Sequence, residues 1–230
     1  YDVLLITLDA ARADHLSLYG YQRPTTPNLE GLGAISYVFE RAWAASNYTA
    51  TSLYALFSGL YPSAWLDGDQ VARVPGLTLA EQLADSGYQT ACVVDLHPAL
   101  PHLYAGFQTV DDTLGIRAAS AVQNRSTGST APEITQLAQA ALDRLEGSAP
   151  PWFLWVHYSE PHAAYLPHRG LDFGPHNADL YDGELAFADR AIGALLEHVR
   201  DAGLLRDTLI IVASDHGEAF GEHGVQTHGQ

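Results

Sequence analysis

Residues 2–8 form a nearly unbroken apolar run, DVLLITL, and this run most constrains what the chain can fold into. A strand that alternates apolar and polar residues has one buried face, whereas an unbroken run indicates burial on both faces. Strands of that kind occur in parallel sheets whose two faces are covered by helices. The run therefore predicts an α/β protein.

The segments that follow alternate between strand and helix patterns, and Thr78 and Glu81 form a capping box that starts one of the helices. The expected strands are 89–94, 152–156 and 209–213, the expected helices are 28–45, 50–60, 78–87, 133–145 and 180–202, and 115–132 is expected to be a mobile surface loop. This alternation predicts a doubly wound, mostly parallel sheet with helices on both faces. We expect a single domain, 1–230, without internal repeats.

The charge balance limits the partners of the chain. It has 27 acidic and 11 basic residues, a formal net charge of −16, and 47% apolar residues, enough for a substantial core. Such a charge repels nucleic acids and anionic membrane surfaces. An anionic substrate then needs a local positive charge, such as a metal ion. The single cysteine, Cys92, excludes an internal disulfide and multi-cysteine metal sites, and its apolar surroundings predict a buried strand residue.

The sequence contains no run of about 20 apolar residues, as a membrane span would need. It opens directly on a strand and contains no methionine, so we expect a segment of a longer protein that lacks the C-terminal part. The remaining parts could hold a signal or an anchor. An extracytoplasmic or membrane-anchored parent protein is compatible with the sequence, and the localisation stays open.

Polar residues gather where the predicted strands end. Asp9 ends the first strand, residues 157–162 follow the third, and Asp215 and His216 follow the last. In open parallel sheets ligands bind beyond these carboxyl ends. Two carboxylates and an imidazole together suit a divalent metal, although Asp9 alone could be a turn residue and an isolated Asp-His pair a solvated loop.

Thr49 stands immediately before the predicted helix 50–60, and two interpretations are open. The first is an N-cap, for which Thr is a preferred residue. In the second, its hydroxyl faces the free N–H groups and the positive dipole end of the helix, which suits a tetrahedral oxyanion. A metal on the same oxygen would lower its pKa and make it a nucleophile.

Five motifs occur in a fixed order: LDAARADH at 8–15, TTPNL at 25–29, SGLYP at 58–62, EPHAAY at 160–165 and SDHGEAFGEHG at 214–224. Together they resemble the ordered motifs of the sulfatase family, in the alkaline phosphatase superfamily, over nearly the whole chain. The resemblance implies an alkaline-phosphatase-like core and a metal bound by Asp9, Thr49, Asp215 and His216. It also implies that His162 and His228 contact the anionic group of the substrate or its leaving oxygen.

The metal implied is a divalent cation: zinc, manganese or calcium. One site is expected, and a second, with His162 and His228 as candidate ligands, stays open. Asn47 is a candidate for hydrogen bonding to an oxyanion, with a turn residue as the alternative. Five other histidines have no partner motif and are expected on the surface or on helix faces: His97, His102, His168, His176 and His198.

The chain departs from the family at three positions. Sulfatases carry Cys or Ser followed by x-Pro-x-Arg at the nucleophile and oxidise it to formylglycine, whereas residues 49–53 are TATSL. Ala10 stands where a second metal-binding Asp is frequent, and Asp95 where many sulfatases have a lysine. Threonine cannot become formylglycine and is similar to the nucleophile of the phosphatase, phosphodiesterase and phosphoglycerol-transferase branches.

We therefore expect a metal-dependent hydrolase that cleaves phosphate or sulfate esters through Thr49. The expected substrate is an anionic ester, either a small molecule or one linked to a lipid or glycan. Two alternatives stay open: a phosphoryl-group transferase of the same superfamily, and a degenerate member that binds an anion without turnover. Carboxylate pairs of the glycosidase type and Ser-His-Asp triads have no comparable support in the sequence.

Overall fold

The computed structural model describes residues 1–67, 70–71, 76–95, 101–114, 129–147 and 151–229. Its centre is a sheet of five parallel strands in the order β5-β4-β6-β1-β7. The strands are β1 (Asp2–Leu8), β4 (Gln89–Val94), β5 (Thr109–Asp111), β6 (Trp152–Tyr158) and β7 (Thr208–Ser214). β1, the unbroken apolar run, lies between β6 and β7, and all but one of its residues are buried, which confirms the predicted burial on both faces.

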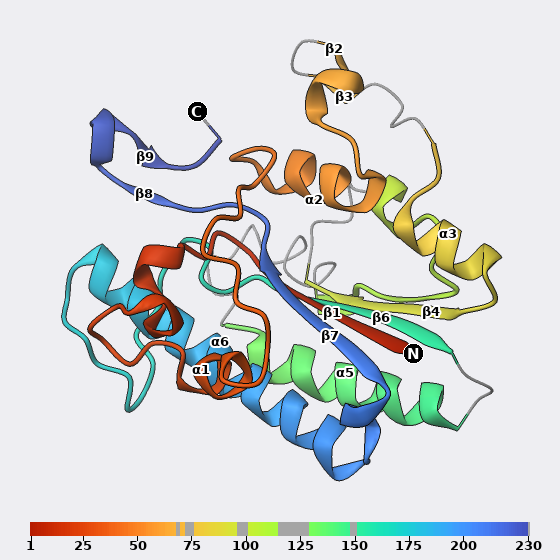
Figure 1. The fold of residues 1–230 in the computed structure, drawn as a ribbon. Helices are drawn as coiled ribbons and strands as arrows, with labels where there is room; N and C mark the ends of the chain where they lie inside the picture. Colours follow the sequence, from red (N-terminus) through yellow and green to blue (C-terminus); the bar gives the residue numbers. More distant parts are fainter. Residues whose placement is uncertain (68–69, 72–75, 96–100, 115–128, 148–150, 230) are drawn as a thin grey trace.

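Helices cover both sides of this sheet (Figure 1). On one side lie α1 (Pro27–Gly33), α5 (Ala131–Glu146) and α6 (Asn177–Asp201), and on the other lie α2 (Thr49–Ser58) and α3 (Leu79–Asp85). Two short antiparallel pairs, β2 (Leu66–Asp67) with β3 (Gln70–Val71) and β8 (Ala219–Phe220) with β9 (Gln226–Thr227), lie outside the main sheet. The predicted doubly wound α/β architecture is confirmed.

Short 3₁₀ helices complete the described elements: Ala13–His15, Ser17–Tyr19, Pro62–Ala64, Pro101–Tyr104, Leu204–Arg206 and Glu222–Gly224. Within the described part of the chain, no helix combines the length and the apolar character that a membrane crossing requires.

The period of two along each strand separates two hydrophobic cores. Leu4, Ile6 and Leu8 of β1 face α5 and α6, in a core made mostly of aliphatic residues and alanines. Leu5, one position away, joins the core under α2 and α3, which is rich in aromatic residues such as Trp155. Neighbouring residues of one strand thus belong to different layers.

The register of the central strands sets the positions of the candidate site. Leu8 pairs with Ser214 of β7 and with Tyr158 of β6, so the three strands end at the same edge. Asp9 follows Leu8, and its backbone N–H donates to the carbonyl of Tyr158 at 2.9 Å. Asp9 and Asp215 therefore leave the sheet side by side.

Several local predictions are confirmed. The strands 2–8 and 89–94 have the predicted bounds, and Cys92 is buried within the second. Both hydrogen bonds of the capping box form: Glu81 N–H donates to Thr78 Oγ1 at 3.1 Å, and Thr78 N–H donates to Glu81 Oε2 at 2.7 Å. These features depend only on residues that are close in sequence.

Other predictions need correction. The helix expected over 28–45 is only α1, and residues 34–48 are irregular and largely exposed. Asp189 of α6 fixes the start of α1 by accepting the N–H groups of Asn28 and Leu29. β5 was not predicted, and β6 runs two residues further than expected. The expected loop 115–132 ends before Ala131, where α5 begins, while 115–128 and His97 lie outside the described residues.

Candidate metal centre and nucleophile site

Three neighbouring strands supply the buried polar residues of the candidate site. Asp9 follows β1, Asp215 and His216 follow β7, and His157 is the second-last residue of β6. All four side chains are buried, although charged groups are seldom buried without partners. Their burial at the carboxyl edge of a parallel sheet is typical of a ligand site.

The four residues that the resemblance implies as metal ligands lie together. Thr49 Oγ1 is 3.0 Å from His216 Nε2 and 3.5 Å from Asp9 Oδ1. His216 Nε2 lies 3.4 Å from Asp9 Oδ1 and 3.7 Å from Asp215 Oδ2. Ligands bound to one ion at about 2.0–2.2 Å are themselves roughly 3–4 Å apart. The spacing suits a single ion.

The orientation of His216 follows from the bond at its other nitrogen. Its Nδ1 lies 2.9 Å from the backbone carbonyl of Gly217, which can only accept, so Nδ1 carries the hydrogen. In neutral imidazole, Nε2 then has the free lone pair, and it points to Thr49 and the two carboxylates. Metal-binding histidines are commonly held in this way by a backbone carbonyl.

Thr49 is not the N-cap of α2, so that interpretation is wrong. Tyr48 is the N-cap residue, with φ −135° and ψ 127°, and no side chain caps the helix. Thr49 is the first helical residue, and its hydroxyl contacts His216 instead. One turn further, the hydroxyl of Ser52 donates to the backbone carbonyl of Asp215, which ties α2 to the end of β7.

His157 was missed as a site residue by the sequence analysis. Its Nε2 lies 3.8 Å from Asp9 Oδ2, and ligand atoms of Asp9, His157 and Asp215 all lie within 4.8 Å of one another. The predicted strand ended at residue 156, which assigned His157 to the following loop. The alternation of Phe153, Trp155 and His157 could have placed it on the face of the sheet that α2 covers.

Two buried polar atoms of the cluster, Asp215 Oδ2 and His157 Nε2, have no hydrogen-bond partner in the described structure. Burial, and then the nearby Asp9 carboxylate, raise the pKa of Asp215. Burial alone would also raise the pKa of Asp9, but His157, followed by His162 and His216, holds it below its usual value. A divalent cation would relieve the repulsion between the carboxylates and satisfy both atoms, so these residues fit one.

His228 and His162 extend the site from the metal cluster toward solvent. The His228 ring lies 4.4 Å from that of His216 and 4.8 Å from that of His162, centroid to centroid. His162 is exposed and its Nδ1 bonds to the carbonyl of Ala163 at 2.7 Å. His228 Nδ1 bonds to Glu218 Oε1 at 3.1 Å. In both rings Nδ1 is engaged, while Nε2 has no hydrogen bond within the described part of the chain.

A buried carboxylate holds His228. Glu218 also accepts a hydrogen bond from the hydroxyl of Tyr165, with 3.0 Å between Tyr165 Oη and Glu218 Oε2. Burial, followed by the Glu218 charge, raises the pKa of Tyr165, so this hydroxyl keeps its proton as a donor. Asn47 is exposed, and its backbone carbonyl accepts the N–H of Gly229 at 3.0 Å. This bond brings the segment of His228 to the loop before Thr49.

The remaining histidines lie away from this cluster. His198 bonds to Asp143 at 2.9 Å on the surface of α6, His176 is the N-cap of α6, and His102 is exposed. His168 differs from the expectation: it is half-buried, bonded to Glu184 at 2.8 Å, and stacked on Phe187.

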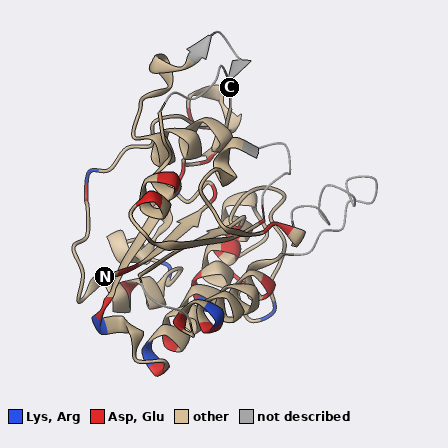
Figure 2. Cartoon of the chain, turned by 90° about the vertical axis from the view of Figure 1, so that its right-hand side faces the viewer, with Lys and Arg blue, Asp and Glu red and all other residues tan. Residues whose placement is uncertain are grey.

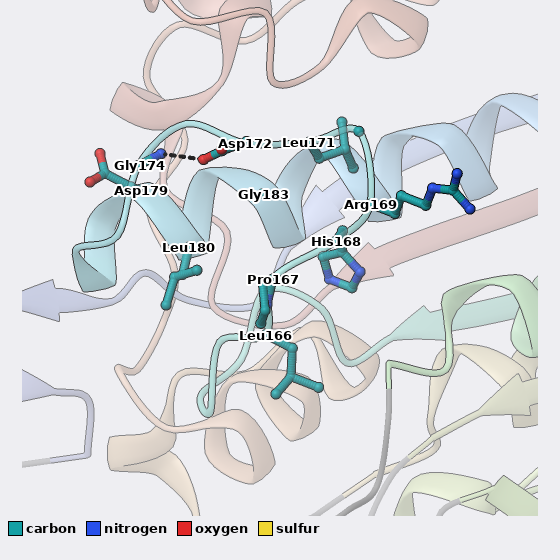
Figure 3. A pocket seen from close by; sticks show the side chains of 11 residues that line it. Leu166, Pro167, His168, Arg169, Leu171, Asp172, Gly174, Asp179, Leu180 and Gly183 are labelled. Atoms are coloured by element: carbon teal, nitrogen blue, oxygen red, sulfur yellow. Dashed lines mark hydrogen bonds between the residues drawn. The ribbon is translucent and has the colours of Figure 1, made fainter.

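Neither the basic residues nor the hollow beside α6 marks the candidate site. In Figure 2 the basic segments lie mainly in the lower, helical part of the view. Arg12 lies at the carboxyl edge of the sheet, where it pairs with Asp14 and Glu222, each at 2.7 Å. A hollow of about 370 Å³ lies beside the start of α6, and Leu166, Arg169 and Asp179 are among the residues that line it (Figure 3). None of the candidate site residues lines it.

The parallel sheet with helices on both faces is the fold of a solved protein in the alkaline phosphatase superfamily from Vibrio parahaemolyticus, with a TM-score of 0.74 at 19% identity, covering 96% of this chain and 55% of that one. The chain belongs to the sulfatase family, whose model matches residues 1–230. It is 23% identical to human iduronate 2-sulfatase over 307 residues, covering 97% of this chain and 56% of that protein.

A second relative is the Kdo(2)-lipid A phosphoethanolamine 7''-transferase of Salmonella typhimurium, 23% identical over 243 residues, with 96% of this chain and 39% of that protein covered. The C-terminal periplasmic domain of EcEptC from Escherichia coli, solved in complex with Zn, has the same fold: the TM-score is 0.74 at 17% identity, covering 99% of this chain and 68% of that one. The chain thus spans roughly half the length of the curated relatives it matches.

Proposed function

We propose that this protein is a metal-dependent hydrolase of phosphate esters that uses Thr49 as its nucleophile. The observation that carries the proposal is the position of the Thr49 hydroxyl. It lies at the start of α2, 3.0 Å from a histidine nitrogen and 3.5 Å from a carboxylate oxygen of the buried cluster. The side chain does not cap the helix, so its hydroxyl is available for chemistry.

Asp9, Asp215 and His216 would hold the ion, together with Thr49. A bound divalent ion lowers the pKa of a coordinated hydroxyl and draws negative charge from the phosphoryl group. Thr49 Oγ1 loses its proton to solvent and attacks phosphorus in line with the departing oxygen. The free N–H groups at the start of α2 and its dipole favour the negative charge that gathers on the phosphoryl oxygens.

His228 and His162 would act at the opposite side of the phosphoryl group. Each has its Nδ1 engaged and its Nε2 free, so a protonated ring can donate from Nε2 to the leaving oxygen. Water then attacks the phosphorus of phosphothreonine, the P–O bond to Thr49 breaks, and inorganic phosphate leaves. The threonine hydroxyl regains a proton and the site is restored.

The chemistry of threonine favours phosphate over sulfate. Formylglycine has a second hydroxyl, which expels sulfate by C–O cleavage, whereas a threonine sulfate ester has no such exit. A phosphothreonine can be attacked at phosphorus by water. Relatives named as a sulfatase and as a transferase of phosphoethanolamine to a lipid support an anionic ester, linked to a glycan or lipid, as the substrate class.

The test compares matched aryl phosphate, phosphodiester and sulfate substrates with zinc, manganese and calcium, using the full-length protein. We expect faster turnover of phosphate esters, and no turnover by Thr49→Ala. Thr49→Ser, which keeps the hydroxyl, should retain activity, and a phosphorylated peptide containing Thr49 should be trapped at short times. Faster sulfate turnover, or wild-type activity of Thr49→Ala, would overturn the proposal.

The relative that transfers phosphoethanolamine supports a second candidate, transfer of the group to an acceptor hydroxyl instead of to water. Both reactions share the phosphothreonine step and differ in what attacks it. Adding an alcohol acceptor to the assay separates them: release of free phosphate alone supports hydrolysis, whereas a phosphorylated acceptor as the main product supports transfer.

A further inference from the structure

His157 is placed on the site side of the sheet by the alternation of β6. Phe153 and Trp155 belong to the core under α2 and α3, and His157 continues their row to the carboxyl edge. It pairs with Thr7 of β1, two residues before Asp9. β6 therefore contributes a side chain to the same point as β1 and β7.

The Nε2 atom of His157 is buried without a hydrogen-bond partner in the described structure, as is Asp215 Oδ2. A buried polar atom without a partner is destabilising, and two of them in one cluster need a common explanation. The nearest carboxylate oxygen, Asp9 Oδ2, is 3.8 Å from His157 Nε2, too far for a hydrogen bond. A single metal ion, bonded to each atom at about 2.0–2.1 Å, fits between the two atoms.

The other nitrogen of His157 is held by a hydroxyl of the neighbouring strand. Nδ1 lies 2.8 Å from Thr7 Oγ1, and the same oxygen accepts the indole N–H of Trp155 at 2.9 Å. A hydroxyl can donate to Nδ1 or accept an Nδ1–H, so this contact permits either neutral tautomer of His157. In the tautomer with hydrogen on Nδ1, the lone pair of Nε2 points at two carboxylates, an arrangement that a cation between them would stabilise.

The distances agree with a shared ion. With metal–nitrogen and metal–oxygen bonds of about 2.0–2.1 Å, two ligands of one ion lie roughly 3.3 Å apart at tetrahedral angles and up to about 4.2 Å when opposed. His157 Nε2 to Asp9 Oδ2 is 3.8 Å, and His216 Nε2 to Asp9 Oδ1 is 3.4 Å. Asp9 stands between the two histidines, with one oxygen toward each.

We propose that His157 is a direct ligand of the divalent ion, in a chain where Ala10 offers no second carboxylate after Asp9. With His216 it gives the site two imidazoles, which favour zinc or manganese over calcium, because calcium prefers oxygen ligands. Thr7 and Trp155 are positioning residues that hold the His157 ring. The inference rests on the metal site of the proposed function and deepens it by naming a ligand and the metal preference.

The test is metal binding by the purified, chelator-treated protein, measured by calorimetry with zinc, manganese and calcium. Loss of a partner that only orients a ligand typically weakens binding about 10–100-fold. We expect His157→Ala to weaken zinc binding by more than that while calcium binding changes little, so that the preference for zinc falls. His168→Ala, which also removes a half-buried histidine bonded to a glutamate, is the matched control and should bind zinc normally.

X-ray absorption of the zinc-loaded protein gives an independent count, with two imidazoles expected in the wild type and one in His157→Ala. If that variant does not fold, Thr7→Val keeps the shape of Thr7 but removes the bond to His157, and should weaken zinc more than calcium. Unchanged zinc affinity in a folded variant, or one imidazole in the wild type, would overturn the inference. Two imidazoles without phosphate-ester turnover would instead overturn the proposed function alone.

Discussion

Toward α5 and α6 the central strands present Leu4, Ile6 and Leu154, whereas toward α2 the next residues of the same strands are Thr7, Trp155 and His157. From Leu4 to Leu8 and from Leu154 to Val156, the residues of the first face are all aliphatic. On the second face, a layer of aromatic side chains leads to a row of polar residues at the carboxyl edge.

The aromatic layer supports the polar row. Phe57 of α2 packs edge-on against Trp155, with ring centroids 4.6 Å apart, and the Trp155 indole N–H holds Thr7, which holds His157. These contacts hold the buried imidazole ring of His157 in one orientation. The face toward α5 and α6 thus mainly supplies stability, whereas the face toward α2 mainly supplies the candidate site, although both faces belong to the same strands.

The largest effect expected on the site face is that of Asp9→Asn, which keeps the shape of the side chain but removes its charge. Turnover should fall by roughly 10³-fold or more, because the ion loses its central carboxylate. Saturating zinc stabilises a binding protein by about 2.7 kcal/mol at 100 times the dissociation constant, and the variant should lose most of this gain. Thermal unfolding with and without zinc measures it.

Asp2→Asn is the matched control for that variant. Asp2 is buried at the opposite end of β1, where it accepts the N–H of Trp152 at 2.9 Å. It should affect stability but leave the response to zinc intact. An equal loss of the zinc response in both variants would contradict the separation between the carboxyl edge and the rest of the strand.

Leu154→Ala should have its large effect on stability and little effect on zinc binding. Leu154 is fully buried in the core under α5 and α6, so the free energy of unfolding should fall by about 2–5 kcal/mol. Zinc affinity of the folded protein should stay within roughly twofold, because the change lies on the opposite face. Denaturant unfolding and calorimetry together decide, and a large loss of zinc affinity would show that the faces are not independent.

His216→Ala should weaken zinc binding by more than about 100-fold, above the usual loss for an orienting partner. His198→Ala should leave it unchanged, because His198 lies on α6 and bonds to Asp143. Zinc or manganese titration of both variants is the measurement. Equal effects would mean that the cluster around Thr49 does not define the metal site.

The sequence was sufficient for features that depend on neighbouring residues. The unbroken run 2–8 predicted β1, and the capping box at Thr78 predicted the start of α3. The candidate site residues Asp9 and Asp215 could be predicted because both directly follow central strands. They lie side by side because Leu8 pairs with Ser214, as expected for parallel strands that end at one edge.

The features that the sequence did not predict depend on tertiary packing or on a boundary that is shifted by one or two residues. The start of α2 lies one residue earlier than predicted, which changed Thr49 from a cap to a helical residue. The end of β6 lies two residues later, which brought His157 into the strand and the site. α1 stops at Gly33 although its pattern continues, and β5 is three residues long, too short for periodicity to detect.

The smallest effect is expected for Glu218→Gln, at the outer end of the site face. Gln can still accept from His228 Nδ1, so the ring stays in place, but the negative charge beside it is lost. If His228 donates to the leaving oxygen, kcat should fall.

At neutral pH we expect kcat to fall by about 10-fold, a fraction of the roughly 10²–10⁴-fold that general acid catalysis contributes. Zinc affinity should not change, because Glu218 contacts His228 and Tyr165 and is not among the candidate ligands. Tyr165→Phe removes only a hydrogen bond to the same carboxylate and should have a smaller effect in the same direction. An unchanged kcat in Glu218→Gln would assign the proton donor to His162, whose Nδ1 is held by a backbone carbonyl that the substitution does not affect.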